Sequence, residues 1–417
     1  MNAEILAIGD EIISGRILDT NSQWLSIRLE DLGIRVLYHT AVADELEPLK
    51  EVFRQALERS DLVISTGGLG PSGNDLTREA LAAAVGRALV TFPEALEHLQ
   101  NLFTRRGRPL TEAHKKQALF PEGARMVPNP HGTAPGIELE VPRPGRSPGY
   151  VFCLPGVPAE MQDIFTQTVA ARLLVLRGDK RVIIHRDIRT FGAPESQVEA
   201  MLPDLIRRGR DPRVGINASQ GTIILRVMTE GADEAECRAK MEPTVKTIYS
   251  ILGNLVFGEN EDELQDAVLR LLEKSNKTLA TAEWATGGMV AHWLNGVPGA
   301  SRWYRGGWVA NSLVGWQAIG ELPPDVVAQQ DLKSGRLVAA IAAACRQQFQ
   351  TDFGLAIGPF PQDLPHADSP GGVHLALATV GETATRTVGI GGHPSMLRVF
   401  CGKHALNFLR LYLLEHS

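Results

Sequence analysis

One glycine-rich segment combines residue types and a position along the chain that suit it to binding an anion. Residues 66–77 read TGGLGPSGNDLT and lie between an apolar stretch at residues 62–64 and a segment with helical periodicity. Glycines let a backbone approach a ligand closely, and the N–H groups that begin a helix carry a partial positive charge. The segment is neither a Walker A loop nor a G-x-G-x-x-G loop. We predict that it binds a phosphate-bearing ligand; the alternative is a tight turn in which Ser72 and Asp75 cap the helix.

Polar residues also follow two other apolar stretches that we expect to be strands. Residues 9–21 come after the stretch at residues 3–8, and LPGVP at residues 154–158 ends the stretch at residues 150–154. Because the carboxyl ends of parallel strands face the same edge of a sheet, these segments and the glycine-rich segment should share one rim. Carboxylates on this rim could bind a divalent cation, although capping or solvation would explain each one alone: Asp10, Glu11, Asp19, Asp44 and Asp75.

Two further segments could contribute to the rim. Lys115 and Lys116, beside His114, could balance the charge of a phosphate, although paired lysines on a helix are commonly just solvated. Residues 129–136, NPHGTAPG, are rich in polar and turn residues and could close over the ligand.

Alternating periodicities in the first half of the chain predict the element order that positions these residues. Apolar runs at residues 3–8, 36–38, 62–64 and 150–154 predict strands, and residues 20–32, 45–58, 75–85 and 93–105 have helical spacing. Strands that alternate with helices are typical of a doubly wound parallel sheet. The proline-rich run PRPGRSP at residues 142–148 predicts irregular structure, as an exposed loop or hairpin tip.

The pattern changes from about residue 180. Residues 182–188 and 222–228 read as strands around a helix at residues 195–205, and a helix at residues 232–250 follows. These elements predict a small α+β unit, and the acidic segment 259–263 marks its boundary with a third, α/β unit. We therefore expect three domains, at residues 1–170, 171–258 and 259–417.

Composition agrees with a multi-domain globular protein. The chain has 417 residues, of which 44% are apolar and 22% charged, and a formal net charge of −6. This charge argues against nucleic acid or anionic lipid as an obligatory partner, and the sequence has no basic leader and no apolar run long enough to span a bilayer. The widely spaced Cys153, Cys237, Cys345 and Cys401 read as buried apolar residues, which fits a reducing cytoplasm.

The first 165 residues resemble the CinA family through an ordered set of motifs. These are GDE at residues 9–11, TN at 20–21, GGLGP at 67–71, DLT at 75–77, KQA at 116–118, GTAPG at 132–136 and LPGVP at 154–158. The resemblance implies a molybdopterin-binding-like fold, metal-dependent ADP-ribose pyrophosphatase activity with an ion of the Mg, Mn or Co type, and a homodimer. One position departs from it: the family has two adjacent aspartates where this chain has Asn74 and Asp75. An amide can ligate a metal through oxygen but supplies no negative charge and no base.

The placement of polar residues on the rim and the resemblance together give three sets of candidate site residues. The catalytic residues would be Asp75 and Lys116, and the metal ligands Asp75, Asn74 and Asp44. The ligand-binding residues would be Asp10, Asn21, Gly67, Gly68, Gly70, Pro71, Ser72, Thr133 and Gly156.

The middle of the chain resembles the family's KH-like domain. RTFG at residues 189–192, followed by Glu195 and Ser196, carries this resemblance, and VFG at residues 256–258 matches the exit of the domain. A KH-like shape alone does not make an RNA-binding protein, and no G-x-x-G loop lies between basic helices here. We therefore expect no RNA ligand.

The C-terminal part resembles the nicotinamide-nucleotide amidase domain of the family but lacks its reactive residues. TAE at residues 281–283, TGG at 286–288, VPGAS at 297–301 and GGWV at 306–309 match the pattern. Where the family has a Ser-Cys pair, whose serine is the nucleophile, this chain has Trp284 and Ala285. The family's tyrosine and lysine fall on Asn311 and Trp316. Without a nucleophile or a base we expect no amidase activity.

Three functional hypotheses stay open. The first is an enzyme whose N-terminal domain hydrolyses a nucleotide diphosphate such as ADP-ribose with the help of a divalent metal. The second is a binding or regulatory protein that holds a nucleotide without efficient chemistry. The third, by analogy of fold alone, is a protein that binds molybdopterin.

Overall fold

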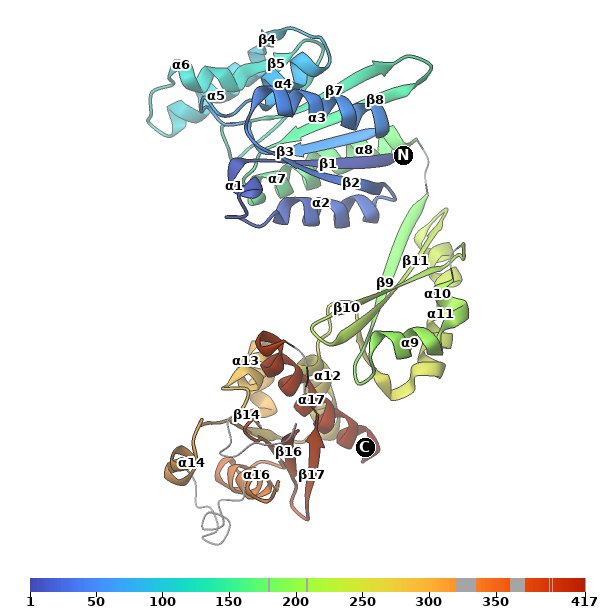
Figure 1. Cartoon of the computed structure of the whole chain (residues 1–417), viewed down its shortest axis with the longest axis vertical. Coiled ribbons are helices and arrows are strands. Elements are labelled where there is room, and N and C mark those ends of the chain that lie inside the picture. The colour runs from blue at the N-terminus through green and yellow to red at the C-terminus, as the bar shows by residue number, and fades with distance from the viewer. Residues whose placement is uncertain are drawn as a thin grey trace. The chain divides into compact units, whose positions relative to one another are not determined.

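A computed structural model describes residues 1–178, 181–207, 209–319, 335–360, 372–389, 391 and 393–416 (Figure 1). The chain forms two compact units. The first consists of Met1–Ile184 with Glu230–Cys237, and the second of His185–Thr229 with Arg238–Ser417.

The first unit is built on a six-stranded sheet with a parallel half and an antiparallel half. Its order is β2-β1-β3-β8-β7-β6, with bounds Arg35–Val42, Asn2–Ile8, Leu62–Thr66, Arg146–Leu154, Gly136–Arg143 and Arg125–Val127. β2, β1, β3 and β8 are parallel to one another, whereas β7 pairs antiparallel with β8, and β6 pairs antiparallel with β7. The parallel half confirms the predicted α/β architecture, and the antiparallel edge is an addition to it.

Alternate residues of each central strand enter separate hydrophobic cores on the two faces of the sheet. Ile5 and Ile64 pack on one face with α2 (Thr20–Asp31), α7 (Pro158–Ile164) and α8 (Ala170–Arg177). Leu6 and Val63 pack on the other face with α3 (Leu46–Arg59), α4 (Thr77–Ala84) and α5 (Pro93–Arg105). Strands buried on both faces read as continuous apolar runs, which is why they were recognisable in the sequence.

Short elements complete the unit. They are α1 (Asp10–Ile13), α6 (Glu112–Lys115), the 3-10 turn Lys116–Ala118, the π-helical turn Phe165–Val169, and the small antiparallel pair β4 (Leu89–Thr91) and β5 (Leu119–Pro121).

The proline-rich run at residues 142–148 is more regular than predicted. The run forms the tip of the hairpin between β7 and β8, which was one of the two predicted forms. The strands continue into this tip, because Arg143 still pairs with Arg146. β6 pairs with residues 136–138 at the start of β7. The rest of β7 is therefore an edge strand among the described residues, and an edge strand tolerates proline because no neighbour needs its N–H group. Arg143 also donates to the carbonyls of Ser60 and Ser147, at 2.9 and 2.8 Å.

The second unit begins with a four-stranded sheet of order β10-β11-β9-β12. The bounds are Arg213–Ser219, Thr222–Gly231, Val182–Thr190 and Val256–Glu259. The helix predicted at residues 195–205 is two helices, α9 (Glu195–Met201) and α10 (Pro203–Ile206), because Pro203 cannot continue a helix from Met201. β10 was not predicted. α11 (Glu234–Leu252) follows the sheet and leads through the 3-10 turn Gly253–Leu255 into β12.

The rest of the second unit is a five-stranded sheet of order β14-β13-β15-β16-β17. The bounds are Tyr304–Val309, Leu279–Glu283, Phe353–Ile357, Val373–Ala378 and Thr383–Val388. One face packs on α12 (Leu264–Ser275), α13 (Met289–Gly296) and α17 (Pro394–Glu415). The other packs on α14 (Leu313–Ile319) and α16 (Arg336–Phe349), and its strands present alanines: Ala280, Ala282, Ala356, Ala376 and Ala378.

All four cysteines are free and buried, as predicted. Burial raises the pKa of the Cys153, Cys345 and Cys401 thiols to about 12, so they are inert as nucleophiles. Among the described residues, no helix combines the length and apolar character that crossing a bilayer requires.

A buried arginine fixes the segment between β3 and α4, residues 67–76, which we call the glycine loop. Arg78, in the first turn of α4, has no exposed surface and donates to the carbonyls of Leu69 and Gly70. Burial lowers its pKa to about 10, which leaves it charged at neutral pH. Its guanidinium group is therefore engaged in hydrogen bonds that hold the carbonyl groups of the glycine loop in place.

Replacing Arg78 with methionine should destabilise β3 and the glycine loop, because the Gly70 carbonyl would lose its guanidinium donor and the Leu69 carbonyl would keep only Gln117, at a cost of about 1–3 kcal/mol. Arg87→Met is the matched control, since Arg87 also donates to two backbone carbonyls but at the surface, at 2.9 and 3.0 Å. Hydrogen-exchange mass spectrometry of residues 62–77 measures the effect. Equal protection in the two variants would contradict this role of Arg78.

Candidate functional site

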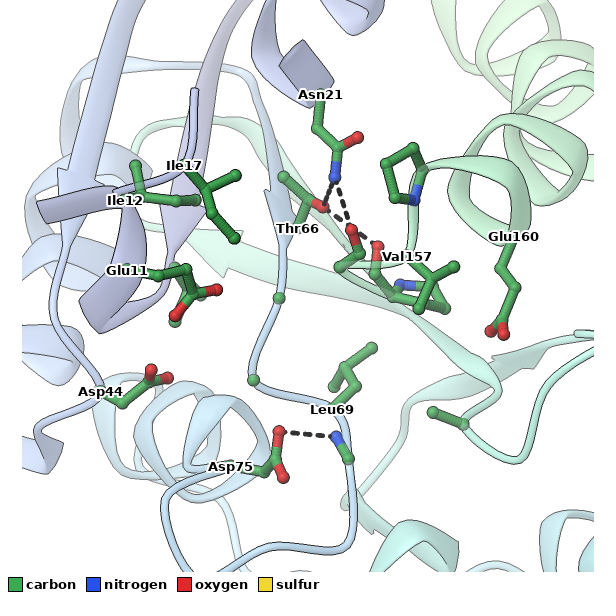
Figure 2. Close-up of a pocket in the computed structure, with 18 of the residues that line it drawn as sticks. Glu11, Ile12, Ile17, Asn21, Asp44, Thr66, Leu69, Asp75, Val157 and Glu160 are labelled. Atoms are coloured by element: carbon green, nitrogen blue, oxygen red, sulfur yellow. Dashed lines mark hydrogen bonds between the residues drawn. The ribbon is translucent and has the colours of Figure 1, made fainter. Parts of the chain in front are cut away.

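A cavity of about 570 Å³ lies where the loops after the parallel strands meet (Figure 2). We call it the rim cavity. Its lining comes from the segment after β1, the residue Asp44 after β2, the glycine loop after β3, and the loop between β8 and α7. The convergence of these segments at the carboxyl edge of the sheet is therefore as predicted.

The glycine loop is folded around the side chain of Asp75. The two carboxylate oxygens of Asp75 accept hydrogen bonds from the backbone N–H groups of Gly70 and Ser72, each at 2.8 Å. A Cβ at Gly70 would lie 2.6 Å from one of these oxygens, so only glycine allows this arrangement. Two of the N–H groups expected to face an anion are thus occupied by an internal carboxylate.

Gly67 and Gly68 have packing roles. Both have positive φ, 107° and 64°, and a Cβ would lie 2.2 Å from the Ile8 carbonyl oxygen or from Oγ1 of Thr77, respectively. Thr77 is fully buried and donates to the Gly67 carbonyl at 2.9 Å. The two glycines therefore let the loop pass close to β1 and α4.

Lys116 holds the glycine loop from outside the cavity. Its Nζ donates to the carbonyls of Asp75 at 2.6 Å and Ser72 at 3.3 Å, and lies 3.1 Å from a carboxylate oxygen of Glu79. Lys116 is not among the residues that line the rim cavity. Its ammonium group is consequently positioned to stabilise the loop.

The rim cavity is strongly acidic. Its described lining contains no lysine, arginine or histidine, and its carboxylates are Glu11, Asp19, Asp44, Asp75 and Glu160. Burial raises the pKa of Asp44 above its ordinary value, and the charges of Asp10, Glu11 and Asp75 raise it further. The site therefore concentrates negative charge from several loops.

Two amides tie the loops of the cavity together. Asn21 donates to Oγ1 of Thr66 and to the Gly156 carbonyl, both at 2.9 Å. Gln117 is fully buried and donates to Oγ1 of Thr133 at 3.1 Å and to the Leu69 carbonyl at 3.3 Å. The bonds of Asn21 join α2, β3 and the loop after β8. The bonds of Gln117 join the glycine loop to residues 129–136.

Most of the predicted ligand and metal residues come together. Those that line the cavity are Asn21, Asp44, Gly67, Gly68, Gly70, Ser72, Asn74, Asp75, Thr133 and Gly156; those that do not are Asp10, Pro71 and Lys116. Asp10 instead exchanges hydrogen bonds with Asp44: each carboxylate accepts from the other's backbone N–H at 3.2 Å.

Thr66, Gln117 and Glu160 are polar lining residues that were not among the predicted site residues. Thr66 ends β3, Gln117 lies within the KQA motif, and Glu160 follows LPGVP by two residues. Glu160 accepts a hydrogen bond from Asn129 at 2.8 Å, and a Cβ at Gly132 would lie 2.0 Å from the same oxygen. The position of these residues within or next to the sequence motifs is the signal that could have identified them as site residues.

The donor atoms of the cavity suit a hard divalent cation, since they are carboxylate and amide oxygens. Within the described part of the chain, however, no three or more His, Cys, Asp or Glu side chains form a group that could hold a metal ion. The protein alone thus offers single oxygen ligands and no complete cage.

In the second unit, the amidase-like motif has a structural role. Glu283, fully buried at the end of β13, accepts hydrogen bonds from Thr286 Oγ1 and from the backbone N–H groups of Gly288, Val290 and Ala291 at 2.6–3.1 Å. Four donors satisfy this buried charge and cap the start of α13.

The positions of the expected serine and lysine are occupied by two packed indoles. Trp284 and Trp316 have ring centroids 6.2 Å apart, and Trp316 is 1% exposed. Ala285 is buried, and its N–H donates to the Gly358 carbonyl at 3.2 Å, while Asn311 is exposed beyond β14. Ala285 and Trp316 therefore belong to the hydrophobic core, Trp284 packs against it and Asn311 faces solvent, and none of the four side chains offers a nucleophile or a base.

Comparison with known proteins agrees with this architecture. Family models match residues 4–174 ("Probable molybdopterin binding domain"), residues 185–258 ("Damage-inducible protein CinA KH domain") and residues 261–413 ("CinA C-terminal domain"). A CinA-like protein of Frankia casuarinae is 37% identical over 99% of this chain and 96% of its own length. A CinA-like protein of Dictyoglomus thermophilum is 37% identical over the whole of both chains. The crystal structure of a CinA protein of unknown function from Thermoplasma acidophilum is 34% identical, with a TM-score of 0.38, and covers 42% of this chain and 99% of its own. With relatives this similar over its full length, the chain belongs to the CinA family.

Proposed function

We propose that the first unit binds a nucleotide diphosphate of the ADP-ribose type as its complex with a divalent cation and hydrolyses the diphosphate linkage. The observation that carries the proposal is the rim cavity: about 570 Å³, closed by the glycine loop, and lined by five carboxylates with no cationic side chain among the described residues. Its volume is in the range of small-molecule and cofactor sites.

The charge of the cavity decides the form in which a phosphate could enter. A bare diphosphate would be repelled by Glu11, Asp44 and Asp75, because like charges a few ångströms apart in a partly buried site repel strongly. A divalent cation reverses this interaction. Mg²⁺ in proteins is commonly bound by one or two carboxylates together with substrate phosphates, which fits a site that offers single ligands but no complete cage.

Within this proposal the chain's own residues have distinct tasks. Asp44 and Asp75, with Asn74, are the residues that would hold the cation together with the phosphates of the ligand. Lys116 and Arg78 hold the glycine loop through its carbonyls. The cation, when bound, would neutralise phosphate charge and polarise the linkage that breaks.

A second candidate function is nucleotide binding without turnover. Two observations favour it. Both oxygens of Asp75 and the ammonium of Lys116 already have partners inside the protein. Asn74 also supplies no charge, so the site has one carboxylate fewer than the family pattern. ADP-ribose turnover, assayed with and without Mg²⁺, Mn²⁺ or Co²⁺, separates the two functions.

Asn74→Asp should increase metal-dependent ADP-ribose hydrolysis several-fold, because a second carboxylate beside Asp75 would bind the cation more tightly. The control is Gln23→Glu, which adds the same charge at an exposed position on α2 outside the cavity. The measurement is the initial rate as a function of metal concentration. An unchanged metal dependence in Asn74→Asp, or hydrolysis undiminished by chelator, would contradict a metal site at Asn74.

Asp44→Asn should weaken cation-dependent nucleotide binding and yet stabilise the ligand-free protein. The raised pKa means that the charged carboxylate of Asp44 costs folding free energy at neutral pH, so its removal should raise Tm by about 1–3 °C. This gain should shrink as the pH falls through the raised pKa, because the wild-type side chain then takes up a proton.

Thermal melts from pH 7 to pH 3.5 measure this effect, with Glu97→Gln on the exposed face of α5 as the control. A Tm of Asp44→Asn at or below that of the wild type at pH 7 would refute the destabilising effect of the Asp44 charge.

The C-terminal domain should release no ammonia from nicotinamide mononucleotide. A nucleophile and its base act as a unit, so losing either one costs several orders of magnitude in rate. Trp284→Ser alone should therefore stay inactive, and Trp284→Ser with Trp316→Lys should regain weak activity at most. Ammonia release that copurifies with the unmodified protein through successive columns would mean that another residue has become the nucleophile.

A further inference from the structure

One carboxylate of the rim cavity has no task in the proposed function so far. Glu160 lies in the first turn of α7, the helix that follows β8, and it lines the cavity. Figure 2 shows its side chain on one side of the chain that runs from Thr66 into the glycine loop, with Glu11 and Asp44 on the other side. Glu160 therefore faces the cavity from a different wall than Asp44, which would hold the cation.

The other lining carboxylates are engaged elsewhere. Asp19 caps the start of α2, and both oxygens of Asp75 accept hydrogen bonds from the glycine loop. The charges of Glu11 and Asp75 act on Asp44, so these three carboxylates lie near one another. The described lining contains no histidine or lysine, so only a carboxylate there could take a proton from water, and Glu160 is the one that lies apart from this group.

A buried amide fixes the carboxylate of Glu160. Asn129, which is 1% exposed, donates to Oε2 of Glu160 at 2.8 Å and to the Ala134 carbonyl at 2.9 Å. Oδ1 of Asn129 accepts from the backbone N–H groups of His131 and Gly132, so each polar atom of this amide has a partner. Within the part of the chain that the structure describes, Oε1 of Glu160 accepts no hydrogen bond, and the residue is half-buried. One oxygen is thus held in place while the other is available to a water molecule in the cavity.

We infer that Glu160 is the general base of the hydrolysis, a catalytic residue that takes a proton from the attacking water. The inference rests on the proposed function and adds a step to it. Oε1 accepts the proton while the water oxygen forms a bond to one phosphorus of the diphosphate. The bond from that phosphorus to the bridging oxygen breaks, its electron pair leaves with that oxygen, and two monophosphates result.

The position of Glu160 agrees with the geometry of such a displacement. The attacking and leaving oxygens lie roughly in line through the phosphorus, so the water must approach from the side opposite the leaving oxygen. A base on a different wall from Asp44 can reach this water without displacing the ligands of the cation. The buried Asn129 holds the carboxylate in one orientation, and such preorganisation favours catalysis.

The test compares two variants of α7. In Glu160→Gln the amide oxygen can still accept from Asn129, but the side chain can no longer take a proton. Asp163→Asn is the matched control: Asp163 lies farther along α7, its carboxylate is 3.4 Å from Nε2 of His131, and it does not line the cavity. Binding is measured by calorimetry with Mg²⁺ and a methylene-bridged analogue of ADP-ribose, which cannot be hydrolysed. Turnover is measured as ADP-ribose hydrolysis at saturating Mg²⁺.

Glu160→Gln should lower kcat about 100-fold or more, because general-base catalysis contributes about 10²–10⁴ in rate. Its affinity for the analogue and the Mg²⁺ concentration at half-maximal rate should stay within about threefold of the wild type, and Asp163→Asn should keep its turnover within about twofold. Formate should restore part of the activity of Glu160→Ala, since a small carboxylate can enter the space of the missing side chain and take the proton.

Three results would overturn this role. Wild-type turnover in Glu160→Gln would leave Glu160 as an anchor of residues 129–136, and the proposed function would stand. Weaker binding of the analogue, or a higher Mg²⁺ requirement, would make Glu160 a residue that binds the ligand or the cation. Failure of the wild type to hydrolyse ADP-ribose with Mg²⁺, Mn²⁺ or Co²⁺ would refute the proposed function, and the general base with it.

Discussion

The site depends on the register between three parallel strands. Thr66, the last residue of β3, stands opposite Ala7 of β1 on one side and Leu154 of β8 on the other. The three strands therefore end at the same level, so the loops that follow them lie next to one another at this edge of the sheet. Asn21 then fastens them, because its single amide reaches both the Thr66 hydroxyl and the Gly156 carbonyl. Strand register determines where the cavity is, and side-chain hydrogen bonds determine its shape.

The glycine loop illustrates what residue types can predict and what they cannot. Glycine, proline and a following helix predicted a tight loop at a strand end, and the loop is there. The direction of its N–H groups was not predictable, because it depends on the Asp75 side chain turning back to accept from Gly70 and Ser72. The helix begins at Thr77 and not at residue 75 for the same reason. The predicted cap of the helix by Ser72 and Asp75 is not formed, because α4 has Leu76 as its N-cap without a side-chain cap hydrogen bond. Asp75 instead closes the loop on itself, and an anion would have to use the remaining groups.

Whole strands and single motif residues also differ in how far residue types alone could predict them. The predicted strands at residues 3–8, 62–64 and 150–154 were visible because burial on both faces makes them uniformly apolar. β10 was not predicted because most of its side chains are exposed and only Val214 is buried, so the strand has no apolar run. Lys116 matched a motif but its position outside the cavity depends on contacts with Ser72 and Glu79 that no spacing reveals. Glu283 shows the reverse case: it matched a motif of a catalytic domain, and in the structure its buried carboxylate accepts the N–H groups at the start of α13.

The alanines on one face of the C-terminal sheet have an evolutionary consequence. Ala280, Ala282, Ala356, Ala376 and Ala378 leave room beside α16, and Trp316 fills part of that room in contact with the same cluster as Trp284. Two substitutions that share one packed volume are not independent. A change at either position alone to the expected serine or lysine would open a void or bury a lone ammonium in this cluster. The two indoles and the expected serine–lysine pair are therefore separated by less stable single variants, which act as a barrier between the two sets of side chains.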